Sequence, residues 1–363
     1  MLAELAARAG YSVVSLDYFG DADLRRLCPG ISLLRDRDMG YSPEILVNTA
    51  SELDASYVIY GASLENHPRQ VARLAREKSL LGNAPETLQR VRNPQQLADA
   101  LKAAGFCFPQ TMRPGAGLVP DPALEWLWKP LRSGGGHSVQ IWPGHFTQEG
   151  ILQEQLDGLV GSAAFVANGL ESVVVGVTEQ FVGDEMFGAE GFRYCGNMLP
   201  PPLPSGELQD LLAQVRAIVN LLTAEFGLRG LNGLDFVWHE GRVCTLEINP
   251  RPTAPLELME QAYDLHLFDA HVQAFSGQLP QFDLEGALQD GTAAAKAILF
   301  AEKDIVISDA SEWFGQGIRD IPYPGDFIKQ GHPVCTVLVT ESSAERCRHK
   351  LERRVAELKT WLY

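Results

Sequence analysis

The feature that most constrains this chain is a stretch near residue 240 in which two β-rich runs flank a short turn. The runs are Leu234–Trp238 and Arg242–Ile248, and His239-Glu240-Gly241 joins them. A short, glycine-containing turn between such runs predicts a β-hairpin. If the strands pair through this turn, residues whose numbers sum to about 480 lie opposite each other. Asp235 then lies within side-chain reach of Glu247.

This hairpin gathers polar groups among apolar residues. Asp235, Glu247 and Asn249 offer two carboxylates and an amide oxygen, which are costly to bury unless a positive group neutralises them. A hard divalent cation such as Mg²⁺, bound with nucleotide phosphates, does so. The alternative is that Asp235 starts a turn and Glu247 caps a loop. Arg251 lies between two prolines that stiffen its backbone, which suits a guanidinium aimed at a phosphate or carboxylate, although a surface arginine is the alternative.

A glycine-rich loop gives the second signal. The run Trp126–Lys129 ends in a lysine, and Ser133-Gly134-Gly135-Gly136-His137 follows. Three glycines allow close approach to phosphates, and their N–H groups can point at oxygen atoms, while Lys129 supplies a point charge. A plain flexible hairpin is the alternative. We assign His137 to loop positioning or to a phosphate contact rather than to a catalytic base.

These two motifs carry a resemblance to a known family. The run Gly233–Phe236, followed by Leu246–Pro252, closely resembles the metal-binding signature of the ATP-grasp ligases, and the glycine-rich loop resembles their phosphate-covering loop. The resemblance covers most of the chain from about Gly61 to Val339. It implies an α/β and α+β fold: an ATP-grasp domain with an N-terminal doubly wound domain and a small β-rich C-terminal domain.

The same resemblance implies where ATP and its metal bind. ATP lies between two subdomains, with its phosphates at Lys129 and at Ser133, Gly134, Gly135, Gly136 and His137. Its adenine lies at Gln153, Glu154, Gln155 and Leu156. One or two Mg²⁺ or Mn²⁺ ions are held by Asp235, Glu247 and Asn249, and the catalytic residues are Lys129, Arg251 and Asn249.

This chain departs from the family in two places near the nucleotide. Relatives often place a ribose-binding carboxylate just after the glycine that follows the adenine segment, where this chain has Leu159 and Val160. Asp157 could substitute, which leaves the ribose contact open. Many members also carry a nucleotide-binding lysine near the position of Pro94. The nearest upstream lysine here is Lys78, to which we assign no role.

Substrate contacts are expected on two further segments. Glu65 and Asn66 follow the predicted strand Tyr57–Tyr60, and loops at the carboxyl ends of such strands form the ligand crevice of an open α/β sheet. The alternative is that Ser63 only caps the next helix. Arg193 and Tyr194 either line the acceptor pocket or belong to a structural turn.

Composition narrows the function classes and the compartment. The net charge of −16 argues against nucleic-acid and anionic-membrane binding, which need clustered Lys and Arg. The six cysteines include no Cys-x-x-Cys pair, so we predict reduced thiols rather than a zinc site or a disulfide framework. Apolar runs fall short of the ~20 residues of a membrane span and no signal peptide is evident, which predicts a cytoplasmic protein.

The expected organisation has three domains. A Rossmann-like N-terminal domain occupies residues 1–85, the nucleotide-binding domain 86–280 and the C-terminal cap 281–363, with Pro280–Asp290 as a linker. The family normally has a strand before its first helix, so either this chain starts late or its sheet lacks that strand. The predicted helices are Leu2–Ala9, Pro43–Leu53, Pro68–Lys78, Gln95–Ala104, Glu207–Phe226, Leu256–Phe275 and Ala344–Trp361.

The activity that the resemblance implies is amide formation. A substrate carboxylate attacks the γ-phosphorus of ATP and displaces ADP, and an amine then displaces phosphate from the resulting acyl phosphate to give the amide. The chain looks most like uncharacterised carboligases grouped near biotin carboxylase, and less closely like tyramine–glutamate ligase, which favours a ligase for a small amino acid or a cofactor of the methanofuran or pterin type. The alternatives are a bicarbonate-activating carboxylase and a non-catalytic ATP-binding protein. The family implies a homodimer.

Overall fold

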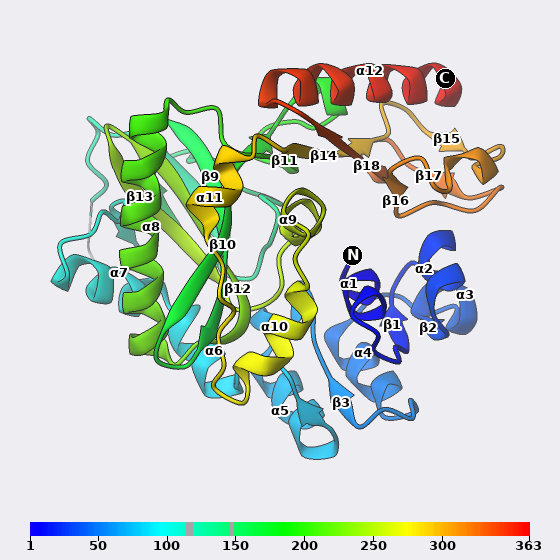
Figure 1. Cartoon of the computed structure of the whole chain (residues 1–363), viewed down its shortest axis with the longest axis horizontal. Helices are drawn as coiled ribbons and strands as arrows, with labels where there is room; N and C mark the ends of the chain where they lie inside the picture. The colour runs from blue at the N-terminus through cyan, green and yellow to red at the C-terminus, as the bar shows by residue number, and fades with distance from the viewer. Residues whose placement is uncertain (114–118, 146–148) are drawn as a thin grey trace.

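The computed structural model describes residues 1–113, 119–145 and 149–363. An 8-stranded antiparallel sheet with the order β13-β12-β9-β10-β11-β14-β18-β16 forms the centre of the molecule (Figure 1). Its strands are β9 (Leu159–Asn168), β10 (Ser172–Val182), β11 (Tyr194–Leu199), β12 (Arg229–His239), β13 (Arg242–Asn249), β14 (Ala293–Phe300), β16 (Ile318–Arg319) and β18 (Pro333–Glu341).

Helices cover both faces of the sheet around β9, which explains the continuous apolar run in this strand. Ala163 and Phe165 point to the face covered by α8 (Ser205–Phe226), whereas Ala164 and Val166 point to the opposite face. There they pack on the segment that contains α9 (Leu256–Tyr263) and α10 (Leu267–Ala274). The alternation of side chains along a strand therefore builds two separate cores.

The C-terminal cap continues the same sheet. Strand β14 pairs with β11, with Asn197 opposite Lys296, and β18 pairs with the other edge of β14. Helix α12 (Ala344–Leu362) covers this part and buries Leu351 and Val355 (top of Figure 1). The cap and the nucleotide-binding half are thus joined by backbone hydrogen bonds as well as by the chain.

A 4-stranded sheet with the order β5-β8-β6-β7 carries the predicted nucleotide residues. Its strands are β5 (Thr111–Met112), β6 (Trp126–Pro130), β7 (Gln140–Ile141) and β8 (Gly150–Glu154). In the β6–β8 pair, Leu127 lies opposite Gln153. Lys129 lies two residues after Leu127 and therefore shares a face with Gln153.

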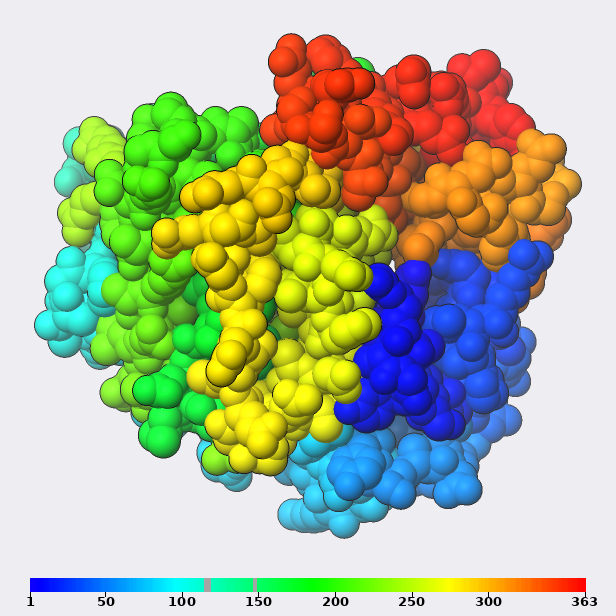
Figure 2. All heavy atoms as spheres, in the orientation of Figure 1, coloured from blue at the N-terminus to red at the C-terminus, as the bar shows by residue number. Residues whose placement is uncertain are grey.

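The N-terminal region contains short parallel strand pairs surrounded by helices. Strands β1 (Ser15–Asp17) and β2 (Gly30–Ser32) form one pair, and β3 (Tyr57–Val58) and β4 (Ser79–Leu80) form another. The helices of the N-terminal region are α1 (Leu2–Arg8), α2 (Ala22–Leu27), α3 (Leu33–Arg37), α4 (Pro43–Ala50) and α5 (Pro68–Glu77), and α6 (Pro85–Val91) and α7 (Pro94–Ala103) begin the nucleotide-binding half. Figure 2 shows this region packed against the cap and the segment of α9 and α10.

Two expectations about helices were wrong. The predicted helix 256–275 is broken into α9 and α10 because Asp264 adopts a left-handed conformation with φ 50°, and the Glu260 carboxylate accepts a hydrogen bond from the Leu267 N–H at 2.9 Å where the second helix begins. The predicted linker 280–290 contains α11 (Leu284–Gln289), which Asp283 caps by accepting from the Gly286 N–H. Within the described residues, no helix combines the length and apolar character that a membrane crossing requires.

Candidate active site

The predicted hairpin is present, and it places two carboxylates opposite each other. Asp235 of β12 pairs with Glu247 of β13, and Gly233 pairs with Asn249. The turn residues Glu240 and Gly241 both have positive φ, 48° and 73°, as the tight turns of two-residue hairpins require. Asp235 therefore lies within reach of Glu247 as predicted, and a register irregularity between Asp235 and Phe236 sets the two carboxylates directly opposite each other.

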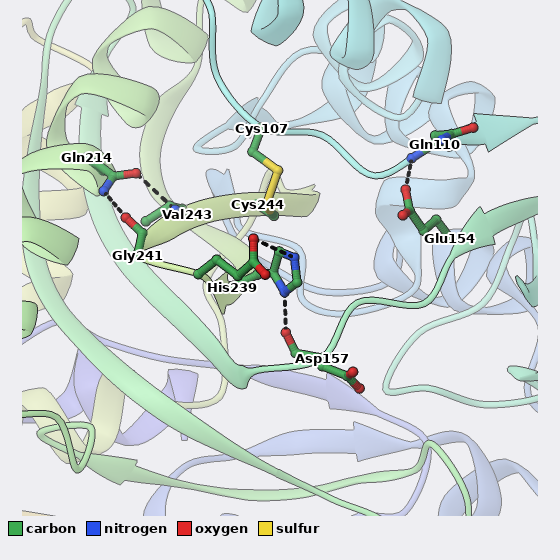
Figure 3. Close-up of a disulfide and its surroundings, with 10 residues drawn as sticks. Cys107, Gln110, Glu154, Asp157, Gln214, His239, Gly241, Val243 and Cys244 are labelled. Atoms are coloured by element: carbon green, nitrogen blue, oxygen red, sulfur yellow. Dashed lines mark hydrogen bonds and ion pairs between the residues drawn. A yellow bond between two sulfur atoms is a disulfide. The ribbon is translucent and has the colours of Figure 1, made fainter. Parts of the chain in front are cut away.

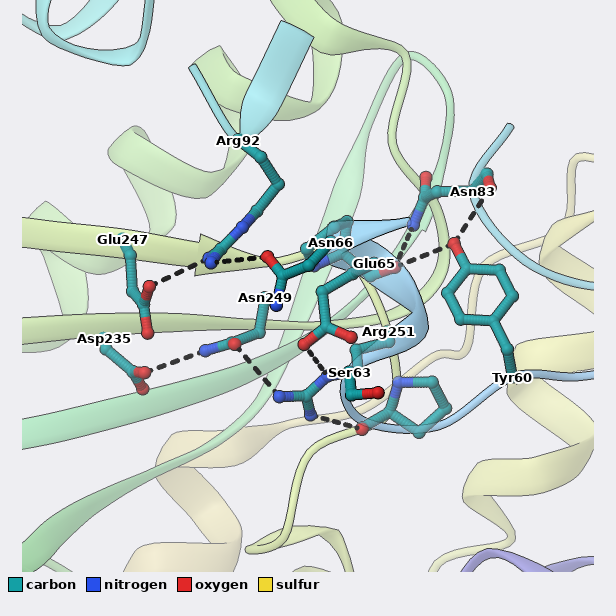
Figure 4. A network of polar contacts seen from close by, with 12 residues as sticks. Tyr60, Ser63, Glu65, Asn66, Asn83, Arg92, Asp235, Glu247, Asn249 and Arg251 are labelled. Carbon is teal, nitrogen blue, oxygen red and sulfur yellow. Dashed lines mark hydrogen bonds and ion pairs between the residues drawn. The ribbon is translucent and has the colours of Figure 1, made fainter. Parts of the chain in front are cut away.

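The two carboxylates differ in their partners. Asp235 accepts hydrogen bonds from the side-chain amides of Gln180 and Asn249, each at 2.8 Å, while Glu247 accepts from Arg92 Nη1 at 2.9 Å (Figure 4). Burial, and then the neighbouring Glu247 charge, raise the pKa of Asp235 to about 6. Burial would also raise the pKa of Glu247, but the charges of Arg92, Lys129 and Arg251 together outweigh it and the pKa is lowered.

Asn249 is the one predicted metal ligand whose oxygen faces elsewhere. Its Nδ2 donates to Asp235, so its Oδ1 turns toward Arg251 and accepts from Nη2 at 3.3 Å. The described part of the chain contains no cluster of three or more His, Cys, Asp or Glu side chains suited to a metal. The expected set has only two carboxylates besides the amide, and its assignment as a metal site stays a proposal.

The loop that carries Glu65 and Asn66 reaches this centre from the N-terminal region. Glu65 is buried in the short helix η1 (Leu64–Asn66) and accepts a hydrogen bond from Arg251 Nε at 2.7 Å. Asn66 Oδ1 accepts from Arg92 Nη2 at 3.0 Å (Figure 4). Ser63, at the start of the loop, has a positive φ of 81°, which is strained for a residue with a side chain. Both predicted substrate residues therefore touch the arginines of the centre.

Lys129, on β6, lies close enough to the carboxylates to interact with their charges. Its Nζ donates to Gln153 Oε1 at 2.5 Å. Burial lowers the pKa of Lys129, while the charges of Glu247 and Asp235 act in the opposite direction. The structure thus brings the predicted phosphate-binding lysine into the electrostatic field of the predicted metal ligands.

The glycine-rich loop closes against the segment before β11. Tyr194 N–H donates to the Gly135 carbonyl at 3.0 Å. A Cβ atom at Gly136, which has φ 71°, would lie 1.7 Å from the Phe192 carbonyl oxygen. Gly136 therefore has a steric requirement for glycine in this closed arrangement. The phosphate contacts predicted for the loop residues Ser133 and His137 remain predictions.

The predicted adenine segment already uses part of its backbone. The N–H groups of Glu154 and Gln155 donate to the carbonyls of Gln110 and Glu125, at 2.8 and 2.9 Å. The carbonyl of Asp157 contacts His239 Nδ1 at 2.7 Å, and the Asp157 residue is exposed. Adenine contacts at Gln153–Leu156 and a ribose contact at Asp157 stay predictions.

Arg193 and Tyr194 are only partly associated with the centre. Arg193 Nη1 donates to the Gly331 carbonyl at 2.6 Å, and its guanidinium lies 5.0 Å from the centre of the Phe300 ring, so it holds the cap. Tyr194 donates to Asn197 Oδ1. Burial, and then the charges of Glu257 and Asp235, raise its pKa.

Two residues of the centre were missed from the sequence. Arg92 bridges Glu247 and Asn66, and Gln180 holds Asp235. Arg92 lies two residues before Pro94, the position near which the family resemblance led us to look for a lysine. A search for any cation there would have found it. Gln180 carries no comparable signal.

The expectation that all six cysteines are reduced was wrong. Cys107 and Cys244, separated by 137 residues, form a disulfide (Figure 3). The segment after α7 pairs with β13 there, and Thr245 N–H donates to the Cys107 carbonyl at 3.2 Å. The remaining cysteines are free and buried, as predicted; they are Cys28, Cys195, Cys335 and Cys347.

Comparison with known proteins identifies a known domain within this chain. Residues 91–255 match the model of the ATP-grasp domain. An uncharacterized protein of Methanocaldococcus jannaschii is 23% identical over 356 residues, which cover 92% of this chain and 84% of that protein.

Solved structures extend the likeness over nearly the whole chain. The biotin carboxylase domain of 2-oxoglutarate carboxylase from Hydrogenobacter thermophilus, a dimer solved with magnesium ADP, ADP and bicarbonate, has a TM-score of 0.71 and 12% identity, and covers 96% of this chain and 85% of that one. N5-carboxyaminoimidazole ribonucleotide synthetase from Thermotoga maritima has a TM-score of 0.66 at 17% identity, with 98% and 94% covered. L-amino acid ligase from Bacillus licheniformis has a TM-score of 0.67 at 14% identity, and the match covers 98% of this chain and 93% of that one.

Proposed function

We propose that this chain, which carries an ATP-grasp domain within an ATP-grasp fold, is a magnesium-dependent ligase that activates a small carboxylate as an acyl phosphate for attack by an amine. The observation that carries the proposal is the facing pair Asp235–Glu247 within the electrostatic field of Lys129. Two carboxylates held in register beside a half-buried ammonium suit a metal–nucleotide complex better than they suit a core.

The chemistry of the donor set fits a divalent cation. Asp235, Glu247 and Asn249 would hold it, although Asn249 must turn its amide to present Oδ1. Burial, and then the facing Glu247 charge, raise the pKa of Asp235, so a bound cation would stabilise its ionised form. When bound, the cation would neutralise charge on the phosphate oxygens.

The chain's own residues would position the reactants. Lys129 would stabilise the charge on the transferring phosphoryl group, and the N–H groups of the Ser133–His137 loop would hold the phosphates. Arg251 would orient the substrate carboxylate near Glu65, to which it is bonded. These groups stabilise charge and fix geometry, which is the main task in phosphoryl transfer.

We also propose a cofactor-biosynthetic substrate of the methanofuran or pterin type and a homodimer in a cytoplasmic setting. A bicarbonate-activating carboxylase is the second candidate. The likeness to a biotin carboxylase domain solved with bicarbonate favours it. This candidate would release ADP with bicarbonate and without an amine.

The experiment that tests the proposal measures ADP release from magnesium ATP with a panel of carboxylates, each with and without amines and bicarbonate. We expect turnover that requires one carboxylate and one amine, and its loss in Glu247→Gln. The matched control is Glu240→Gln, since Glu240 lies in the exposed turn of the same hairpin. ATP binding without turnover across the whole panel would contradict the ligase and favour a non-catalytic ATP-binding protein.

A further inference from the structure

A cavity adjoins the reaction centre and is lined by positively charged side chains. It has a volume of about 440 Å³ and lies between the N-terminal region, α6 and the approach to the glycine-rich loop. Such a volume is within the roughly 300–1,000 Å³ of small-molecule sites. Its polar lining consists of Asn66, His67, Arg69, Gln70, Gln89 and Arg132.

The charge of this lining is opposite to that of the protein. The chain has a net charge of −16, yet the described residues that line the cavity include two arginines and no carboxylate. The side chains of Arg69 and Arg132 are exposed, and neither forms a hydrogen bond or ion pair with another residue that the structure describes. Two guanidiniums left without anionic partners in an acidic protein indicate a site for an anion from outside the chain.

The two arginines come from parts of the fold that the cavity separates. Arg69 lies in α5 of the N-terminal region, and Arg132 directly precedes the glycine-rich loop. His67 lies near enough to Arg132 for its pKa to be lowered, first by burial and then by that charge. An uncharged His67 can still donate one hydrogen bond to an anion.

One residue of the cavity lining is hydrogen-bonded to the reaction centre. Asn66 lines the cavity and accepts a hydrogen bond from Arg92, and Arg92 in turn holds Glu247. Two side chains, those of Asn66 and Arg92, therefore link the cavity to the Glu247 carboxylate (Figure 4).

We propose that this cavity is a subsite for a second anionic group, a carboxylate or a phosphate, on the carboxylate substrate. The substrate class is then a small dianion, with its reacting carboxylate near Arg251 and its other anionic end between Arg69 and Arg132. The identity of the ligand as substrate rests on the proposed ligase function. The subsite itself does not require turnover.

The test is calorimetric titration of the full-length protein, saturated with magnesium and a non-hydrolysable ATP analogue so that the nucleotide site is filled. The probes are glutarate, 3-phosphonopropionate and pentanoate. Glutarate and pentanoate have the same chain length and differ in the second carboxylate, and 3-phosphonopropionate tests a phosphate-like end. We expect at least one dianion to bind about tenfold or more tightly than pentanoate, because a charge-assisted contact contributes about 1.5–3 kcal/mol.

Substitutions locate the effect. Arg69→Gln and Arg132→Gln should each weaken dianion binding about tenfold and leave pentanoate binding unchanged. Arg76→Gln is the matched control, because it removes the same charge from an exposed position of the same helix outside the cavity. Affinity for the ATP analogue should be unchanged in Arg69→Gln.

Several outcomes would overturn the subsite: equal affinity for all three probes, no measurable binding of either dianion, or a full dianion preference in Arg69→Gln. Failure of the ligase proposal is distinguishable from these outcomes. Dianion binding that depends on Arg69 and Arg132, without ADP release on any amine, would retain the subsite and contradict the ligase. Turnover of monocarboxylates with no dianion preference would retain the ligase and contradict the subsite.

Discussion

Two charged centres lie along the same central sheet, and they are built differently. At the closed centre, Lys296 of β14 pairs with Glu257 of α9, and the two side chains are only 6% and 7% exposed. At the open centre, Asp235 faces Glu247, whose side chain is 43% exposed and bonded to Arg92. The closed centre holds one charge of each sign. The open centre places two like charges together.

The difference separates a structural group from a functional one. Lys296 also donates to the Ala254 carbonyl at 3.3 Å, so the closed centre joins the cap to the segment before α9. A balanced ion pair out of contact with water has little to offer a ligand. At the open centre, burial and like charge raise the pKa of Asp235, which is characteristic of sites that bind cations or do chemistry.

The largest effect should come from breaking the closed pair. Lys296→Met leaves the Glu257 carboxylate buried without its partner, which should lower the free energy of unfolding by about 3–5 kcal/mol. Denaturant titration measures it. The double variant Lys296→Met/Glu257→Leu should recover most of this loss. The control Lys350→Met, which removes a half-exposed pair with Glu341, should cost at most about 1 kcal/mol.

A substitution at the open centre should affect turnover strongly and stability little. Glu247→Gln removes one of two facing carboxylates, so the free energy of unfolding should change by no more than about 1 kcal/mol, while turnover should fall about 10²-fold or more. Denaturant titration and ADP release on the same preparation separate the two effects. A stability loss as large as that of Lys296→Met would show that Glu247 is a structural residue.

Metal affinity at the open centre should depend on pH. The pKa of Asp235 is raised from 3.8 to about 6, so the folded protein retains this proton up to about pH 6. Mn²⁺ binding, followed by electron paramagnetic resonance, should strengthen as pH rises, by up to about tenfold per unit below pH 6, and level off above it. The stability contribution of the same shift runs in the opposite direction to metal binding: it is fully present below about pH 4 and is lost as pH rises through about 6.

Asp235→Asn provides the control for this pH dependence. The variant lacks the group whose pKa is about 6. Its remaining affinity for Mn²⁺ should therefore be nearly independent of pH between about 5 and 7. A pH dependence of equal size in the variant would place the titrating proton on another group. It would also remove the electrostatic distinction between the two centres.

The smallest effect should come from Arg92. Its guanidinium is 2.9 Å from Glu247, where it would compete with a divalent cation. Arg92→Gln should therefore tighten Mn²⁺ binding by roughly threefold. Arg242 is exposed and begins β13, the strand that carries Glu247, so Arg242→Gln should leave the affinity for Mn²⁺ unchanged. Weaker binding in Arg92→Gln would mean that Arg92 orients Glu247 for the metal.

The local parts of the site could be predicted because local rules decide them. A short turn limits hairpin register, so Asp235 was placed within reach of Glu247 from the numbering, while the register irregularity that sets them directly opposite appeared only in the structure. The strand that ends in Lys129 and the glycine-rich loop were likewise evident from composition. Helix boundaries were less predictable. The break at Asp264 depends on a side-chain bond from Glu260 to the Leu267 N–H, which periodicity does not reveal.

The sequence by itself determined the ligand types of this protein: the paired carboxylates, the lysine and the glycine-rich loop lie within short segments whose spacing sets their geometry. Only the tertiary structure decided which distant groups join them. Arg92 and Glu247 are 155 residues apart, Glu65 and Arg251 are 186 apart, and Cys107 and Cys244 are 137 apart. Such contacts form when whole elements pack against each other, and that packing depends on the complementarity of entire surfaces rather than on any local pattern.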